Sequence, residues 1–178
     1  MRAVIPLPDR GYLLECFDYN PRTGMLRWKV RPESHFETQR TCDWWNKRWA
    51  GTIAGAKTLS AVQVSLDRNS YTAHRLIYGI MGEEIPDEME IDHRNRNWSD
   101  NRWVNLRLAT RFQNMRNASK WSCKVLPKGI RLCGKKFQAR IMVDRKPINL
   151  GLFATLEKAV SAYSVASKNL HGEFGCHG

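Results

Sequence analysis

A strictly alternating stretch near the C-terminus restricts the fold more than any other feature of the chain. Phe137, Ala139, Ile141 and Val143 point to one side of an extended backbone, and the residues between them point to the other. This period of two residues is typical of a β-strand with one buried face. We therefore predict a strand over residues 135–144 with one apolar face and one largely polar face.

Helical periodicity follows this strand. After a turn over residues 144–147 and a second strand over 148–153, Thr155 is placed to cap a helix. The chain therefore predicts a three-stranded antiparallel sheet backed by one helix, after a connection over residues 120–127. The apolar residues that recur with helical spacing are Leu156, Ala159, Val160, Tyr163, Ala166 and Leu170.

The excess of positive charge is concentrated in the same part of the chain. Of the formal net charge of +12, residues 120–178 contribute +8, residues 89–119 contribute +3 and residues 1–88 contribute +1. Such an excess indicates a polyanionic partner, and a small basic sheet can enter the major groove of duplex DNA. The alternative is an ordinary solvated sheet face. The candidate DNA contacts here are Lys128, Arg131, Lys136, Gln138, Arg140, Arg145 and Lys146.

Several classes of protein are disfavoured by composition. The chain is 42% hydrophobic, which is too apolar for a disordered protein. It has no uncharged apolar stretch of membrane-spanning length and no signal-peptide pattern at its start. We therefore expect a cytoplasmic protein without a membrane partner. No C-x-x-C pair occurs, so we expect reduced thiols and no structural zinc for Cys16, Cys42, Cys123, Cys133 and Cys176.

Residues 89–117 combine the groups that phosphodiester hydrolysis requires. This reaction needs a base for water, a divalent cation and positive charge to hold the DNA backbone. His93 can supply the base, and Asp92 with an amide oxygen can supply hard ligands for the cation. Residues 100–102 are interpreted as loop-building. The arginines available to hold phosphates are Arg94, Arg96, Arg107, Arg111 and Arg116, with Arg102 nearby.

The order of these residues resembles the signature of HNH nucleases, in the form found in phage and intron-encoded homing endonucleases. His93 directly follows Asp92, and Asn105 and Asn114 lie 12 and 21 positions after the histidine. The resemblance covers residues 73–117 and implies a ββα-metal site. It implies that His93 is the general base, that Asn105 holds the imidazole by a hydrogen bond, and that Asp92 and Asn114 bind one Mg²⁺ or Mn²⁺. A small-molecule cofactor is not expected. His74, in the flanking segment, is interpreted as structural, with a phosphate contact as the alternative.

The C-terminal part has a resemblance of its own. The segment from KGIRLCGKKFQARI through LGLFATLEKA to HGEFG is similar to an AP2-type DNA-binding domain. Such domains lay their sheet in the major groove, which agrees with the alternation described above. An HNH segment followed by an AP2-like domain is a pattern of mobile HNH endonucleases.

The N-terminal third carries less information about function. We expect a short helix over residues 11–18, a strand over 24–30 and a hairpin around 67–70. The segment 42–51 contains three tryptophans and a basic pair. It is interpreted either as a DNA-contacting element or as a scaffold whose tryptophans anchor the core.

The predicted fold class is α+β. A small mixed region (1–60) precedes a ββα-metal HNH domain (61–119), a linker (120–127) and the AP2-like domain (128–178). The predicted function is site-specific cleavage of duplex DNA, in the bacterial host cytoplasm if the protein is phage-encoded. A monomer would nick one strand, whereas a homodimer would cut both. The alternative is a non-catalytic AP2-like DNA-binding regulator.

Overall fold

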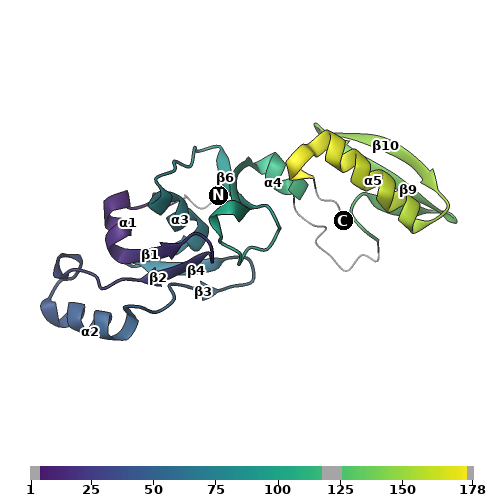
Figure 1. Cartoon of the computed structure of the whole chain (residues 1–178). Helices are drawn as coiled ribbons and strands as arrows, with labels where there is room; N and C mark the ends of the chain where they lie inside the picture. Colours follow the sequence, from purple (N-terminus) through teal and green to yellow (C-terminus); the bar gives the residue numbers. More distant parts are fainter. Residues whose placement is uncertain (1–4, 118–125, 176–178) are drawn as a thin grey trace. The chain divides into compact units, whose positions relative to one another are not determined.

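The computed structural model of the protein describes residues 5–117 and 126–175 (Figure 1). The chain divides into two compact units, Met1–Leu108 and Ala109–Gly178. Each unit contains helices and small antiparallel sheets around its own apolar core, which confirms the α+β class. Most of the predicted linker 120–127 lies outside the described residues. Within the described ranges, the helices are too short or too polar to cross a bilayer.

The first unit is built from short elements around one core. Leu13, Phe17, Val64, Leu76 and Ile77 are almost completely buried in it. Its elements are α1 (Arg10–Cys16), β1 (Phe17–Asn20), β2 (Met25–Trp28), a 3₁₀ turn (Glu33–His35), α2 (Gln39–Trp49), β3 (Ala56–Lys57), β4 (Val62–Leu66), β5 (Asn69–Thr72), α3 (Ala73–Met81), β6 (Met89–His93), a second 3₁₀ turn (Trp103–Asn105) and the start of β7 (Leu106–Thr110).

Local chemistry fixes two hairpins of this unit. In the β1–β2 turn the side-chain oxygen of Asn20 accepts hydrogen bonds from the backbone N–H groups of Arg22 and Thr23. The two-residue β4–β5 turn consists of Asp67 and Arg68, both with positive φ, as the twist of a tight hairpin requires. The predicted hairpin around residues 67–70 is therefore confirmed.

The apolar run over residues 103–108 favours a strand by its sequence, but only its second half forms one. Residues Trp103–Asn105 form a 3₁₀ turn, because the Asn105 N–H bonds back to the Arg102 carbonyl at 2.9 Å. The Trp103 N–H instead donates to the carbonyl of Pro21 at 3.1 Å. Pairing with β6 begins only when β7 starts at Leu106.

The second unit contains the predicted sheet and helix. Its strands form an antiparallel sheet in the order β10-β9-β8, and α5 lies along the sheet (Figure 1). The Thr155 hydroxyl accepts a hydrogen bond from the Lys158 N–H, which confirms the predicted cap. The elements are α4 (Arg111–Asn117), β8 (Ile130–Cys133), β9 (Lys136–Val143), β10 (Lys146–Phe153), α5 (Leu156–His171) and a 3₁₀ turn (Gly172–Phe174).

The core of the second unit lies between this sheet and α5. Ala139 and Ile141 of β9 are buried against Ala159 and Tyr163 of α5, as the two periodicities predict. Gly129 lies so close to the Tyr163 ring that a Cβ there would come within 2.1 Å of it.

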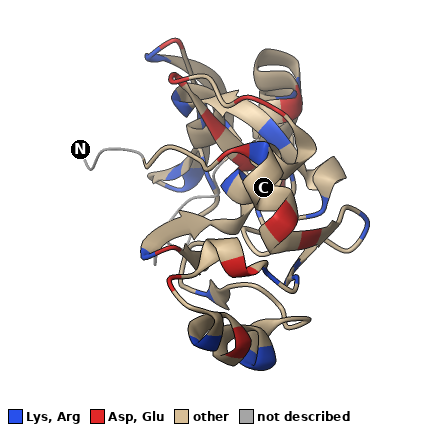
Figure 2. Ribbon diagram, turned by 90° about the vertical axis from the view of Figure 1, so that its left-hand side faces the viewer, with Lys and Arg blue, Asp and Glu red and all other residues tan. Residues whose placement is uncertain are grey.

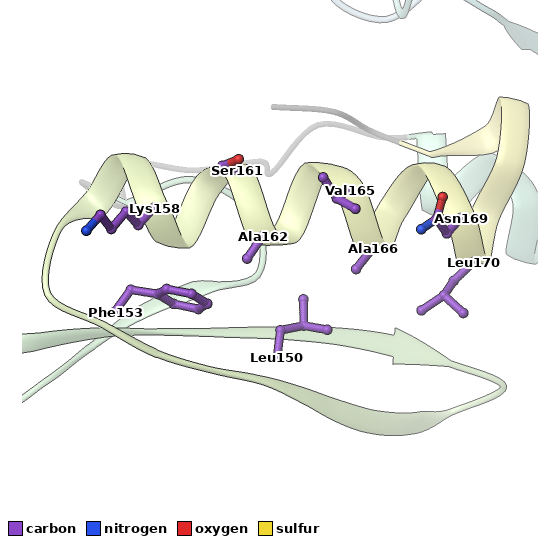
Figure 3. Close-up of a pocket in the computed structure, with 9 residues that line it drawn as sticks. All are labelled: Leu150, Phe153, Lys158, Ser161, Ala162, Val165, Ala166, Asn169 and Leu170. Atoms are coloured by element: carbon purple, nitrogen blue, oxygen red, sulfur yellow. The ribbon is translucent and has the colours of Figure 1, made fainter.

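One residue of the predicted apolar stripe lies outside this core. Leu170 is 44% exposed, because the buried row of α5 continues from Tyr163 to Ser167. Leu170 lines an open groove between α5 and β10 instead, together with Leu150 and Phe153 (Figure 3).

Candidate active site

The end of β6 presents the two residues that the sequence places at the centre of the site. Asp92 and His93 are consecutive on this strand and are only 5% and 7% exposed. Strand β6 pairs with β7, and the two are joined by the loop over residues 94–105. The loop returns to the imidazole and carries several of the groups that surround it.

The imidazole of His93 is held by Asn101. The Nε2 atom of His93 lies 3.0 Å from Oδ1 of Asn101, which is itself buried. An amide oxygen can only accept a hydrogen bond, so Nε2 carries the proton and Nδ1 is the basic nitrogen of the neutral ring. This arrangement favours the tautomer of His93 that carries its proton on Nε2.

A second histidine packs against the first. The rings of His74 and His93 meet edge to face, with centroids 5.3 Å apart. Thr72 Oγ1 lies 2.9 Å from His74 Nε2. Burial, followed by the charges of His93 and Arg75, lowers the pKa of His74 to about 3. His74 is therefore neutral near pH 7, and this favours the structural interpretation over a contact with phosphate.

Asp92 forms a buried ion pair with Arg107. Both Nε and Nη2 of Arg107 lie 2.8 Å from Oδ2 of Asp92, and the two side chains are 5% and 6% exposed. The sequence places Arg107 among the phosphate contacts, whereas the structure places it in the interior. A buried arginine needs a carboxylate partner, and Asp92 supplies it. Arg107 therefore acts on the site through Asp92.

Asn105 holds the loop together. Its side-chain oxygen accepts from the Asn95 N–H at 3.0 Å, and its Nδ2 donates to the Asn95 side chain at 3.0 Å and to the Asp100 carbonyl at 2.7 Å. Its own carbonyl accepts from the Arg94 N–H at 2.8 Å. The amide bonded to the imidazole is thus that of Asn101, a residue that sequence reasoning assigned only to loop building. Its position eight residues after His93 carries no signal by itself.

The remaining arginines of the loop have different environments. Arg94 and Arg96 are exposed directly after His93. Arg102 pairs with Asp100 at 2.6 Å, and this hydrogen bond holds the pKa of the Asp100 carboxyl at about 2. A phosphate contact therefore stays a prediction for the exposed Arg94 and Arg96.

The other predicted residues of the HNH segment belong to the second unit. Asn114 is half-buried on α4, and Arg111 is exposed at the start of that helix. Arg116 forms an ion pair with Asp144 at 3.2 Å. The Lys128 ammonium donates to the carbonyls of residues 115 and 116 at 3.2 and 2.8 Å, where a cation stabilises the C-terminal end of a helix.

The sheet face away from α5 carries a row of polar side chains. Arg131 donates to the Gln138 side chain, which donates in turn to Asn149 at 3.1 Å, so the row crosses all three strands. Arg140 lies opposite Asn149 in the register of β9 and β10. The exposed basic residues of this unit include Arg131, Lys136, Arg140, Arg145 and Lys146.

The tryptophans of α2 divide between the two interpretations. Trp45 packs on the core and meets Trp28 edge to face at 5.0 Å. Trp44 and Trp49 are 61% and 39% exposed, and the Arg48 guanidinium lies 5.8 and 5.2 Å from their rings. Figure 2 shows this helix at the bottom of the view, with basic positions beside an acidic one. Trp45 is a scaffold residue, and a DNA contact stays a prediction for the other two.

The side chains that could bind a metal ion near His93 offer oxygen atoms. Across residues 5–117 and 126–175, no three His, Cys, Asp or Glu side chains gather as they would around a metal ion. Within the first unit, the Asp92 carboxylate is an oxygen donor of the kind that a hard cation such as Mg²⁺ or Mn²⁺ prefers. Arg107 already neutralises part of the Asp92 charge.

Comparison with known proteins gives the same family for this region. Residues 71–116 match the HNH endonuclease family. This segment is therefore similar to an HNH endonuclease domain. The chain is 33% identical over 117 residues to an uncharacterized HNH endonuclease of Acanthamoeba polyphaga mimivirus, a match that spans 65% of this chain and 61% of that protein. No solved structure matches the chain. HNH nucleases generally use a divalent metal.

Proposed function

We propose that the protein is a metal-dependent endonuclease that hydrolyses a phosphodiester bond of duplex DNA. The observation that carries this proposal is the defined tautomer of His93 beside the Asp92 carboxylate. A base and a hard oxygen ligand at the end of one strand are the two groups that metal-assisted hydrolysis requires. The match of residues 71–116 to the HNH family supports the same chemistry.

In the proposed reaction His93 acts as the general base. Its Nδ1 takes a proton from water, the water oxygen bonds to phosphorus, and the bond from phosphorus to the 3′ oxygen breaks. The 3′ oxygen leaves with the bonding electron pair and takes a proton from solvent water. The products carry a 5′-phosphate and a 3′-hydroxyl. Asn101 Oδ1 accepts a hydrogen bond from the Nε2–H group throughout, which keeps the basic nitrogen fixed.

Asp92 and Asn114 are the proposed ligands of one Mg²⁺ or Mn²⁺. When bound, the cation supplies positive charge for the phosphate oxygens and the leaving oxygen. Arg94 and Arg96 provide further positive charge next to His93. Because Arg107 shares the Asp92 carboxylate, it holds that carboxylate in place on β6 and limits its net charge.

DNA binding is proposed for the sheet of the second unit. Its basic residues and the Arg131–Gln138–Asn149 row support a groove-reading face, and its strands and helix agree with the AP2-like interpretation. One HNH site per chain cuts one strand, so a monomer would nick and a homodimer would cut both strands. This division of labour is that of a mobile, homing-type endonuclease.

The test is cleavage of supercoiled plasmid by purified protein with Mg²⁺ or Mn²⁺. We expect relaxed circles from nicking, or linear DNA if two chains act together. The His93→Ala variant should lose cleavage and keep its DNA affinity, because the imidazole contributes to the reaction and not to binding. Cleavage by His93→Ala at the wild-type rate would contradict the role of this residue as general base.

A gel-shift series with the same DNA separates the nuclease from a regulator. Arg140→Ala should weaken binding and reduce its dependence on salt by about one phosphate contact, whereas Lys168→Ala, which removes an exposed charge from α5, should not. Binding without any cleavage by the wild-type protein would favour a non-catalytic regulator. Equal affinity and salt dependence for Arg140→Ala would leave the sheet face without a role in binding.

A further inference from the structure

We infer that Asn101 is a positioning residue for His93, and that the β1–β2 hairpin holds Asn101 in its working position. This inference rests on the proposed role of His93 as general base. It gives part of the N-terminal region a function in cleavage that is independent of DNA contact.

The hydrogen bond between Asn101 and His93 determines which ring nitrogen carries the proton. Asn101 is 5% exposed and its Oδ1 lies 3.0 Å from Nε2 of His93. Loss of this acceptor would allow the proton to occupy either ring nitrogen, and only one tautomer has its basic nitrogen at Nδ1. An orienting partner of this kind acts on catalysis through the base and does not touch substrate.

The β1–β2 hairpin, a distant part of the chain, forms hydrogen bonds with the loop that carries Asn101. The Tyr19 hydroxyl at the end of β1 donates to the Asn101 carbonyl at 2.8 Å. Two residues further along the loop, the Trp103 N–H donates to the carbonyl of Pro21 at 3.1 Å. The hairpin thus bonds to the loop on both sides of Arg102, and Trp103 also packs on the Tyr78 ring of α3 with centroids 4.9 Å apart.

Gly24 of the hairpin packs closely against the backbone of Asn101 and Arg102. This residue closes the β1–β2 turn with a φ of +73°. A Cβ at this position would lie 2.5 Å from the Arg102 nitrogen and 2.6 Å from the Asn101 carbonyl carbon. Only glycine lets the turn pack against the loop at this distance. The backbone of Asn101 is therefore fixed by the hairpin, and its side chain is fixed against His93.

The test combines a spectroscopic measurement with cleavage kinetics. Protein with ¹⁵N-labelled histidine is studied by long-range ¹H–¹⁵N correlation at about pH 8.5. We expect His93 to carry its proton on Nε2 in the wild type and to become a mixture of tautomers in Asn101→Ala. The same variant should lower kcat by about 10- to 100-fold and leave KM and DNA affinity almost unchanged.

Three further variants separate positioning from folding. Asn101→Asp keeps an acceptor oxygen and should restore the wild-type tautomer and most of kcat. Tyr19→Phe removes one hydrogen bond without a clash and should lower kcat by about two- to tenfold. Asn97→Ala is the matched control, because the side chain of this exposed loop asparagine bonds to the Ser99 backbone and hydroxyl, and it should behave like the wild type.

Two results would overturn the inference. The first is a wild-type tautomer and an unchanged kcat in Asn101→Ala. The second is an equal loss in Asn101→Ala and Asn97→Ala, which would show a general effect of loop disruption. If the wild-type protein does not cleave DNA, the proposed function fails, while the tautomer of His93 still tests the positioning role of Asn101.

Discussion

The buried ion pair between Arg107 and Asp92 gives the sharpest prediction for stability. Arg107→Met keeps most of the side-chain volume and removes the charge, which leaves the Asp92 carboxylate in the interior without its partner. Because both side chains are at most 6% exposed and both nitrogens lie 2.8 Å from one oxygen, we expect a loss of about 3–5 kcal/mol. That is a large share of the roughly 5–15 kcal/mol by which domains are stable.

The assay is urea unfolding at neutral pH, followed by tryptophan fluorescence. A double-mutant cycle with Asp92→Asn isolates the pair. The double variant has no buried charge left at this position, so it should be more stable than Arg107→Met alone by at least about 2 kcal/mol. The loss in Arg107→Met should also be almost the same at low and high salt, because buried pairs are weakly screened.

Three outcomes would refute this reasoning about the pair. The first is a loss of stability below about 1 kcal/mol in Arg107→Met, which is typical of a solvent-exposed pair. The second is a coupling energy near zero in the double-mutant cycle. The third is a loss of stability that disappears at high salt. Each would mean that Arg107 reaches solvent, where it could serve as the phosphate contact that the sequence suggests.

Other predictions concern pH, packing and the surface. His74 binds a proton below about pH 6.5 in the unfolded chain but only near pH 3 in the folded one. The free energy of unfolding should therefore fall by about 1.4 kcal/mol between about pH 7.5 and 5.5. His74→Gln should remove this fall when the free energy of unfolding is measured in urea at several pH values, and an unchanged dependence on pH would contradict the prediction. Gly129→Ala should destabilise the second unit by about 2–4 kcal/mol, because its Cβ would meet the Tyr163 ring. Gly134→Ala has open space around the new Cβ and should cost only about 1 kcal/mol. Thermal unfolding of the two variants measures the difference. Trp44→Ala should leave stability unchanged and weaken DNA binding by about 1–3 kcal/mol if its ring stacks on a base; unchanged affinity in an anisotropy titration would assign this ring to solvent.

Local patterns were sufficient to predict much of the fold. The alternation from Phe137 to Val143 and the helical spacing after Thr155 specify a strand and a helix, because one face of each must be buried. The structure has both elements within a few residues of the predicted bounds. The order of residues from Asp92 to Asn114 was likewise enough to identify the HNH segment, since nuclease chemistry requires these groups in one place.

The contacts between distant segments were not predictable in the same way. Tyr19 and Asn101 are separated by 82 positions, and no periodicity links a hairpin turn to a loop so far along the chain. The Trp103–Asn105 segment illustrates the consequence. Its apolar residues favour a strand locally, but the bond from Trp103 to the Pro21 carbonyl directs that backbone N–H to the hairpin instead of a neighbouring strand.

Not all of the positive charge of the chain is available to a partner. The sequence alone places Arg107, Arg116 and Lys128 among the candidate DNA contacts, because such residues are rarely buried. Arg107 and Lys128 instead stabilise the protein internally, and Arg116 pairs with Asp144. We therefore expect the number of phosphates that the protein neutralises to be smaller than the number of its cations, and the salt dependence of DNA binding to report only the exposed ones. In the proposed reaction, internal cations such as Arg107 would contribute by keeping the carboxylate beside His93 in position.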